Sequence, residues 1–179
     1  TLTKPARALQ VLAGRECQGD MDMLQKKGAK GFSTFMAYYI LTAIAKTGGK
    51  DTLEILKTYY GGMLARGATT FWEDFDIEWL ENSCRIDELP KEGQKDIHGD
   101  FGKHCYTQFR HSLCHGWSAG VLAFVVEYIL GVRITDNGEK VSVSPNTMGL
   151  KEIQAKLPLK DGWLLIQIQD GNVEIKEIQ

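Results

Sequence analysis

The chain has 179 residues and a mass of 20.0 kDa, and its 43% hydrophobic and 25% charged content excludes a disordered or fibrous protein. Its formal net charge of −2 argues against a general nucleic-acid binder, because such proteins carry an excess of basic residues. The longest unbroken apolar run, residues 35–41, is too short to cross a bilayer. Since the first residue is Thr1 rather than Met, we expect a fragment of a longer protein.

Helical patterns dominate residues 1–131. Thr3 is a predicted N-cap for a first helix, which has Pro5 in its first turn and ends at Gly14. A second, short helix is expected over residues 20–27, before Gly28.

A stronger helix is predicted to begin at Ser33 and to end at Gly48, because apolar residues recur there at three- and four-residue steps. Asp51 and Glu54 form a capping-box pattern for the next helix, and we expect Gly61-Gly62 to loosen its end. Residues 81–104 have the composition of a long loop.

A last helix is predicted over residues 118–130, and its apolar residues on nearly all sides predict that it is buried all round. After Gly131 the period changes from 3.6 to 2, with a hairpin signal at Asp136-Asn137-Gly138. Alternating segments at residues 150–157, 163–169 and 172–178 complete a small antiparallel sheet of four or five strands. The fold class is therefore mainly α with a β tail.

Several common chemistries lack their motifs. There is no GxGxxG and no GxSxG, and Asp51 follows Lys50 where a phosphate loop needs Ser or Thr. The four cysteines form no CxxC pair, and we expect them to be buried, reduced thiols. Potential metal ligands cluster at His98, His104, Cys105, His111, Cys114 and His115.

His111 and His115 have the i,i+4 spacing of helical zinc ligands, but Ser112 stands where a zincin has Glu. We therefore predict no metal and no cofactor.

The segment GATTFWEDFD at residues 67–76 opens a stretch, residues 73–100, with ten acidic and only three basic residues. Within it, Glu73 lies between Trp72 and Phe75. A carboxylate beside aromatic walls loses hydration and becomes a better general base. The alternative is a surface loop in which Glu73 caps a helix or pairs with a lysine.

The segment HSLCHGWSAGV at residues 111–121 places His115 and Trp117 directly before the apolar helix. A histidine at the mouth of a helix can donate a hydrogen bond into a cavity. The alternative is a core histidine whose hydrogen bonds are satisfied internally.

Together, GATTFWE at residues 67–73 and CHGWSAG at residues 114–120 resemble motifs of the α-L-rhamnosidase family of glycoside hydrolases. The segment KGFSTFMAYYILTAIAKTG at residues 30–48 is similar to the family's helix before the first motif. The resemblance implies that residues 1–131 are the C-terminal part of a catalytic (α/α)6 barrel of six helical hairpins. Residues 132–179 would then form a C-terminal antiparallel β-sandwich or sheet.

By this resemblance, Glu73 is the general base of an inverting reaction, His115 binds a sugar hydroxyl, and Trp72 and Trp117 are substrate-binding aromatics. The general acid lies upstream of this chain in the family, so we expect these 179 residues alone to be inactive. We also expect self-association, through helix faces that the missing half of the barrel would cover. The family often has WERWD where this chain has WEDFD, which changes the charge and wall of the implied pocket.

Other functions remain open at this point. A related barrel glycosidase could act on an α-fucoside or a uronide, and a polysaccharide lyase would use Tyr and His instead of a carboxylate pair. A carbohydrate-binding module would need aromatic platforms but no poised base. The sequence leaves the exact sugar and the cellular compartment open.

Overall fold

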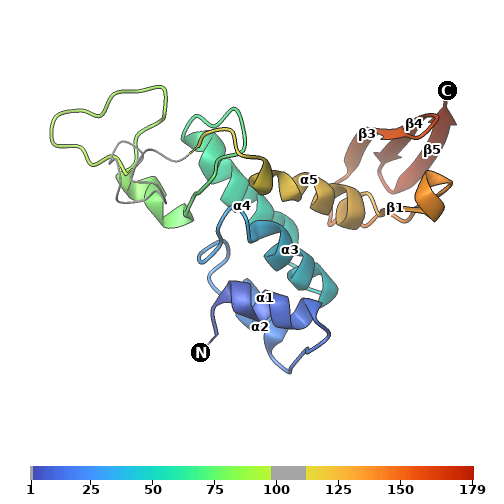
Figure 1. Cartoon of the computed structure of the whole chain (residues 1–179), viewed down its shortest axis with the longest axis horizontal. Helices are drawn as coiled ribbons and strands as arrows, with labels where there is room; N and C mark the ends of the chain where they lie inside the picture. Colours follow the sequence, from blue (N-terminus) through green and yellow to red (C-terminus); the bar gives the residue numbers. More distant parts are fainter. Residues whose placement is uncertain (1, 98–111) are drawn as a thin grey trace. The chain divides into compact units, whose positions relative to one another are not determined.

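The computed structural model describes residues 2–97 and 112–179, and the chain divides into two compact units, Thr1–Ala123 and Phe124–Gln179. The first unit is helical. Its α-helices before residue 98 are α1 (Lys4–Leu12), α2 (Asp20–Gln25), α3 (Ala37–Lys46) and α4 (Thr52–Ala65), followed by the 3-10 helix η1 (Ile77–Asn82) (Figure 1).

The start of the chain confirms the predicted N-cap. The hydroxyl of Thr3 accepts a 3.4 Å hydrogen bond from the amide of Ala6, and Pro5 lies in the first turn of α1. A 3.0 Å ion pair between Arg7 and the buried Asp20 ties α1 to α2. Lys4 donates a 2.5 Å hydrogen bond to the carbonyl of Gly28, and burial lowers the pKa of Lys4 to about 8.

The two central helices differ from their predicted bounds. α3 begins at Ala37 rather than at Ser33, because residues 34–36 form a turn. The Asp51 side chain makes no cap for α4; its main-chain amide instead donates a 3.0 Å hydrogen bond to the side chain of Gln25. Gly61-Gly62 does not loosen α4, which continues to Ala65.

The expected partial (α/α)6 barrel is wrong. Such a barrel is a ring of paired antiparallel helices, whereas α1, α2 and α3 have only nine, six and ten residues and pack on one another (Figure 1). α4 is the longest described helix, with 14 residues, and its contacts with α3 are sparse. Periodicity identified the apolar face of each helix, but it carried no information about which helix covers that face.

The predicted last helix is broken into three pieces: a 3-10 turn, η2 (Gly116–Ala119), an α-helical turn, α5 (Gly120–Phe124), and a π-helical turn, η3 (Val125–Ile129). Val121 and Phe124 are buried, but Leu122 is 57% exposed, so the expectation of burial on all sides is wrong. The boundary between the two units falls inside this segment, earlier than Gly131.

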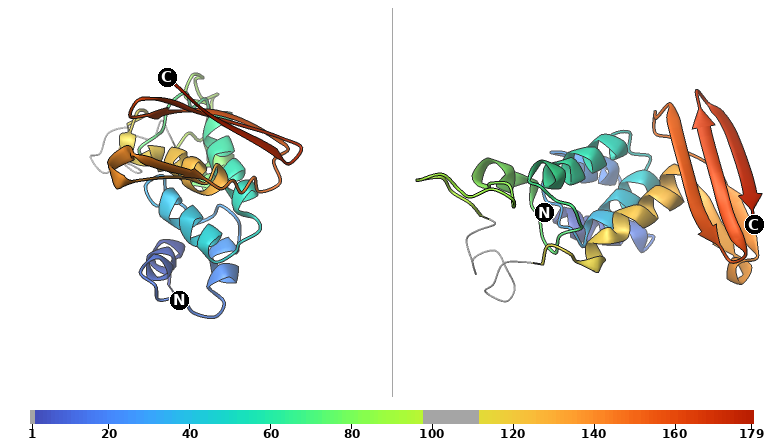
Figure 2. Two further views of the ribbon diagram at one scale, coloured as in Figure 1. Left: turned by 90° about the vertical axis from the view of Figure 1, so that its right-hand side faces the viewer. Right: turned by 90° about the horizontal axis from the view of Figure 1, so that it is seen from above.

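The second unit contains two antiparallel sheets rather than one. The hairpin predicted around residues 136–138 is confirmed as β1 (Val132–Thr135) and β2 (Lys140–Val143). The remaining segments form a three-stranded sheet of β3 (Glu152–Leu159), β4 (Gly162–Gln169) and β5 (Asn172–Ile178), which lie side by side in Figure 2. β5 has the predicted bounds.

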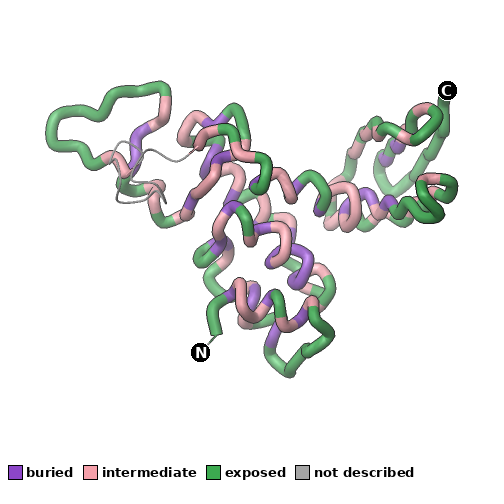
Figure 3. The backbone as a smooth tube through the Cα atoms, viewed as in Figure 1, coloured by how far each residue is buried: buried purple, intermediate pink, exposed green. Residues whose placement is uncertain are grey.

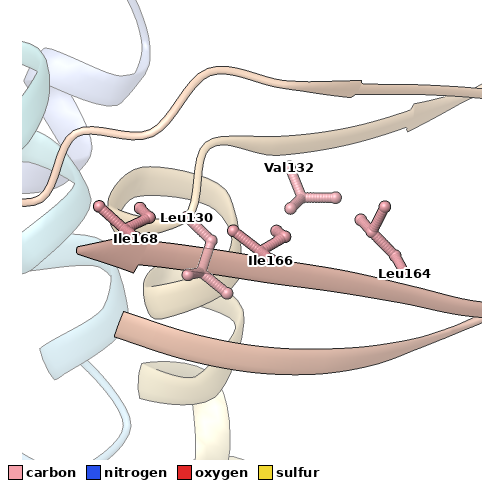
Figure 4. Close-up of a cluster of buried hydrophobic side chains, with 5 residues drawn as sticks. All are labelled: Leu130, Val132, Leu164, Ile166 and Ile168. Atoms are coloured by element: carbon pink, nitrogen blue, oxygen red, sulfur yellow. The ribbon is translucent and has the colours of Figure 1, made fainter. Parts of the chain in front are cut away.

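The core of this unit lies on one face of β4. Leu164, Ile166 and Ile168 alternate along the strand and are almost fully buried, as their shared face predicts. Leu130 and Val132, which come before and at the start of β1, complete this cluster (Figure 4). Val125 and Val126 pack against the cluster, so the end of the helical segment belongs to this core.

β5 is exposed along its whole length (Figure 3). Val173 and Ile175 pair directly with Ile168 and Ile166 of β4, so all four side chains lie on the same face of the sheet. Nevertheless Ile166 is 1% exposed and Ile175 is 44% exposed. The apolar cover of this face therefore ends at β4.

No helix among residues 2–97 and 112–179 is long and apolar enough to cross a membrane.

Candidate active site around Glu73

The two sequence motifs lie side by side in the first unit and are joined by hydrogen bonds. The main-chain amide of Glu73 donates to the carbonyl of Ser112 at 2.8 Å, and the amide of His115 donates to the carbonyl of Phe71 at 2.7 Å. Two hydroxyl groups add to these contacts: Thr70 donates to the carbonyl of Leu113, and Ser118 to the carbonyl of Trp72. Residues 70–73 and 112–118 therefore form one structural element.

Helix α4 contacts Phe75, which lies two residues after Glu73. The buried hydroxyl of Tyr59 donates a 2.6 Å hydrogen bond to the carbonyl of Phe75, and the two rings lie 5.4 Å apart. Gly62 makes the close approach possible, since a Cβ at this position would lie 3.0 Å from the Phe75 ring and 2.8 Å from Ile77. Gly62, which was expected to loosen the end of α4, instead makes room for Phe75 and Ile77.

Glu73 is half-buried, and its carboxylate is fixed by a hydrogen bond from a main-chain amide. Its Oε2 accepts a 2.8 Å hydrogen bond from the amide of Ser112. The carbonyl oxygen of Glu73 accepts two further hydrogen bonds, from the indole Nε1 of Trp117 at 2.9 Å and from the hydroxyl of Thr34. Both the side chain and the backbone of this residue are thus fixed by groups distant in sequence.

His115 is half-buried, and its ring centroid lies 4.5 Å from that of Trp117. Because Trp117 also bonds to the backbone of Glu73, it connects the imidazole to the residue that bears the carboxylate. The structure therefore brings Glu73, His115 and Trp117 into one neighbourhood.

Trp72 occupies a different position. Its side chain has no exposed surface, and its ring packs at 6.0 Å from that of Phe75 in the core. The exposed aromatic nearest to Glu73 in these contacts is Trp117, at 41% exposure. Trp72 therefore supports the backbone beneath the site and does not form its wall.

Sequence reasoning missed Phe35. This residue is 44% exposed, and its ring lies 5.5 Å from that of Trp117. It stands in an apolar run that was assigned to a helix, so nothing in its local pattern distinguished it from a core residue. Only the turn at residues 34–36 directs it toward the second motif.

The cysteine expectation holds in part. Cys84 is buried, but Cys17 and Cys114 are exposed, and all three are free thiols. Among the described residues, no group of His, Cys, Asp and Glu side chains is arranged to hold a metal ion. His98, His104, Cys105 and His111 lie outside the described residues.

A hollow of about 510 Å³ in this unit lies between the loop after α2, α4 and η1. Its lining carries the exposed ion pair of Lys30 and Glu78, whose charged groups are 2.9 Å apart. This pairing raises the pKa of Lys30 and lowers that of Glu78. Because Lys30 and Glu78 pair with each other, neither is a better candidate for a catalytic acid or base than the oriented carboxylate of Glu73.

Neither a scan of protein-family models nor a search of curated proteins finds a match for this chain.

Proposed function

We propose that this chain contributes the general base of an inverting glycoside hydrolase that removes terminal α-linked deoxy-sugars, as its rhamnosidase-type motifs imply. The observation that carries the proposal is the joining of the two motifs at Glu73. One oxygen of the Glu73 carboxylate is oriented by a main-chain amide, and the backbone of Glu73 is bonded to an exposed indole that packs against an imidazole. Such a set of groups is suited to water activation beside a sugar ring.

In the proposed reaction, Oε1 of Glu73 accepts a proton from a water molecule as the water oxygen attacks the anomeric carbon. The glycosidic C–O bond breaks, and the leaving oxygen takes a proton from a carboxylic acid. Inversion requires that acid to lie about 6.5–9.5 Å from the base, which leaves room for the water. By the resemblance, the acid belongs to a part of the enzyme that precedes these 179 residues.

His115 and Trp117 have binding roles in this proposal. The imidazole of His115 forms a hydrogen bond with a sugar hydroxyl, and the indole of Trp117 contacts the apolar face of the sugar. The Nε1 donor of Trp117 is already bonded to the Glu73 carbonyl, so its ring acts as an apolar surface.

The test uses 2,4-dinitrophenyl α-L-rhamnoside, whose leaving group departs without protonation and so reports on the base without the acid. We expect the chain to turn over this activated substrate, whereas we expect no activity of the chain alone on natural glycosides. We expect Glu73→Gln to lower kcat/KM by about 10³-fold. The matched control is Glu81→Gln, an exposed glutamate of the same acidic segment, which leaves the rate unchanged.

Azide provides a second, diagnostic measurement. In Glu73→Ala it replaces the activated water as nucleophile, so turnover recovers and the product is the β-L-rhamnosyl azide with inverted configuration. Turnover of this rhamnoside that survives Glu73→Gln would contradict the proposed role of Glu73 as the general base. Sugar binding without hydrolysis, unaffected by the same change, would identify a binding module.

A further inference from the structure

Phe35 belongs to a row of aromatic rings that runs across the surface to the candidate site. Its ring centroid lies 5.7 Å from that of Tyr39 and 5.5 Å from that of Trp117, and Trp117 lies 4.5 Å from His115. The Phe35 and Trp117 rings are tilted by 56°, so they form an angled pair and not a stack. Both remain over 40% exposed.

A hydrogen bond from the residue before Phe35 fixes the position of Phe35 relative to Glu73. Thr34, directly before it, is buried and bonds through its hydroxyl to the carbonyl of Glu73. Trp117 bonds to the same carbonyl oxygen through Nε1. The positions of both exposed rings are therefore fixed by hydrogen bonds to the same atom, the carbonyl oxygen of Glu73.

Contiguous exposed apolar surface marks interaction sites, and ligand sites are lined by aromatic side chains. Here the imidazole of His115 lies beside the Trp117 ring, and Trp117 bonds to the backbone of Glu73, the residue that bears the carboxylate. Imidazole and carboxylate groups both pair with hydroxyl groups. An aromatic surface bordered by hydrogen-bonding groups matches a pyranose, which has an apolar C–H face and hydroxyl groups around its edge.

We propose that Phe35 is a substrate-binding residue that forms, with Trp117, a two-ring wall against the apolar face of the sugar. This inference rests on the proposed function and adds to it a contact from the turn before α3.

The test measures hydrolysis of 2,4-dinitrophenyl α-L-rhamnoside and binding of L-rhamnose, by saturation-transfer NMR, to the full chain. We expect Phe35→Ala to raise KM and the dissociation constant five- to tenfold with less than a twofold change in kcat. Phe35→Tyr, which keeps a ring, restores both constants to within twofold of the wild type. Leu64→Ala removes an apolar side chain of α4 that is more exposed than Phe35, and it leaves both constants unchanged.

The failures of the two proposals are distinguishable. If the wild type neither binds nor hydrolyses the rhamnoside, the proposed function fails and Phe35 loses its role with it. If the wild type acts on the sugar and Phe35→Ala matches it, only the role of Phe35 is overturned. A Phe35→Ala variant that keeps full sugar affinity but changes its size-exclusion volume would show that the ring pair binds protein instead.

Discussion

Glu73 and Ser112 are joined by a reciprocal pair of hydrogen bonds: the amide of Glu73 donates to the Ser112 carbonyl, and the amide of Ser112 donates to Oε2 of Glu73, both at 2.8 Å. The pair uses main-chain groups on the Ser112 side, so it depends on the path of the chain and not on the serine side chain. It makes Glu73 a structural residue as well as a candidate base.

Removal of the Glu73 carboxylate therefore has a stability cost. We expect Glu73→Ala to lower the free energy of unfolding by about 2 kcal/mol, since hydrogen bonds to charged groups contribute about 1.5–3 kcal/mol. Glu73→Gln keeps an acceptor oxygen and costs about 1 kcal/mol. Urea denaturation measures both. A Glu73→Ala cost no larger than that of the exposed Glu81→Ala would contradict the structural role.

Ser118, in the second motif, also has a structural role. Its fully buried hydroxyl bonds to the carbonyl of Trp72, so Ser118→Ala leaves that carbonyl without this donor inside the core. We expect a loss of about 2 kcal/mol in urea denaturation. Ser112→Ala is the matched control, because its hydroxyl bonds locally to Cys114 near the surface, and we expect a loss below about 0.5 kcal/mol.

Tyr59 predicts an alkaline loss of stability. Burial raises the pKa of Tyr59 well above its usual value, so above about pH 10 the unfolded chain loses this proton while the folded chain keeps it. The contribution of Tyr59 to the free energy of unfolding is complete below that pH and decreases by up to about 1.4 kcal/mol per pH unit above it.

We expect Tyr59→Phe to make the stability curve between pH 10 and 11.5 less steep, as measured by urea denaturation at each pH. The half-buried Tyr60, whose pKa is also raised by burial of its hydroxyl, supplies the slope that remains in the variant. Identical slopes for the variant and the wild type would show that the Tyr59 proton is lost equally in both states.

Gly131 joins the helical segment to β1 in a backbone conformation with φ of +66°. A Cβ at this position would lie 1.8 Å from the carbonyl oxygen of Ser144, so the backbone must move to accept a side chain. We expect Gly131→Ala to cost at least about 3 kcal/mol, more than the conformational term alone.

Gly149→Ala is the control for that substitution. Gly149 also has a positive φ, of +89°, but a Cβ there meets open space. We expect it to cost about 1 kcal/mol, which is the conformational term. Equal losses for the two variants in urea denaturation would mean that the contact with Ser144 has no effect.

Ile166 and Ile175 provide a direct comparison across two paired strands. They are opposite each other on the same face, but Ile166 is buried and Ile175 is exposed. We expect Ile166→Ala to lower the free energy of unfolding by about 3 kcal/mol and Ile175→Ala by less than about 1 kcal/mol. Similar losses would indicate that β5 is covered in solution.

Local patterns were sufficient for the strands. Alternation along residues 163–169 predicted that Leu164, Ile166 and Ile168 share a face, and turn residues at 136–138 predicted the first hairpin. The alternation could not predict that Ile175 stays exposed. Its pattern matches that of a buried strand, and its exposure depends on where the facing elements end.

Glycines show the same division. Gly14 ends α1 with a positive φ, as its place after an apolar repeat indicates. Gly62 also follows an apolar helical repeat in the sequence, but it lies inside α4 and makes room for Phe75. A glycine that ends a helix and a glycine that allows a close approach differ only in their tertiary neighbours.

The sequence by itself predicted helices before Gly131 and strands after it, because the period of the apolar residues within a segment differs between helix and strand. It did not predict the 3-10 helix η1 or the division of the last helix into η2, α5 and η3. It also identified both motifs, but it led to a barrel that the short, mutually packed helices do not form. Only the tertiary structure decided that Trp72 is buried, that Phe35 and Trp117 are exposed together, and that Ser112 holds Glu73. These facts depend on contacts between segments about 40 to 80 residues apart, for which the local sequence contains no period or signal.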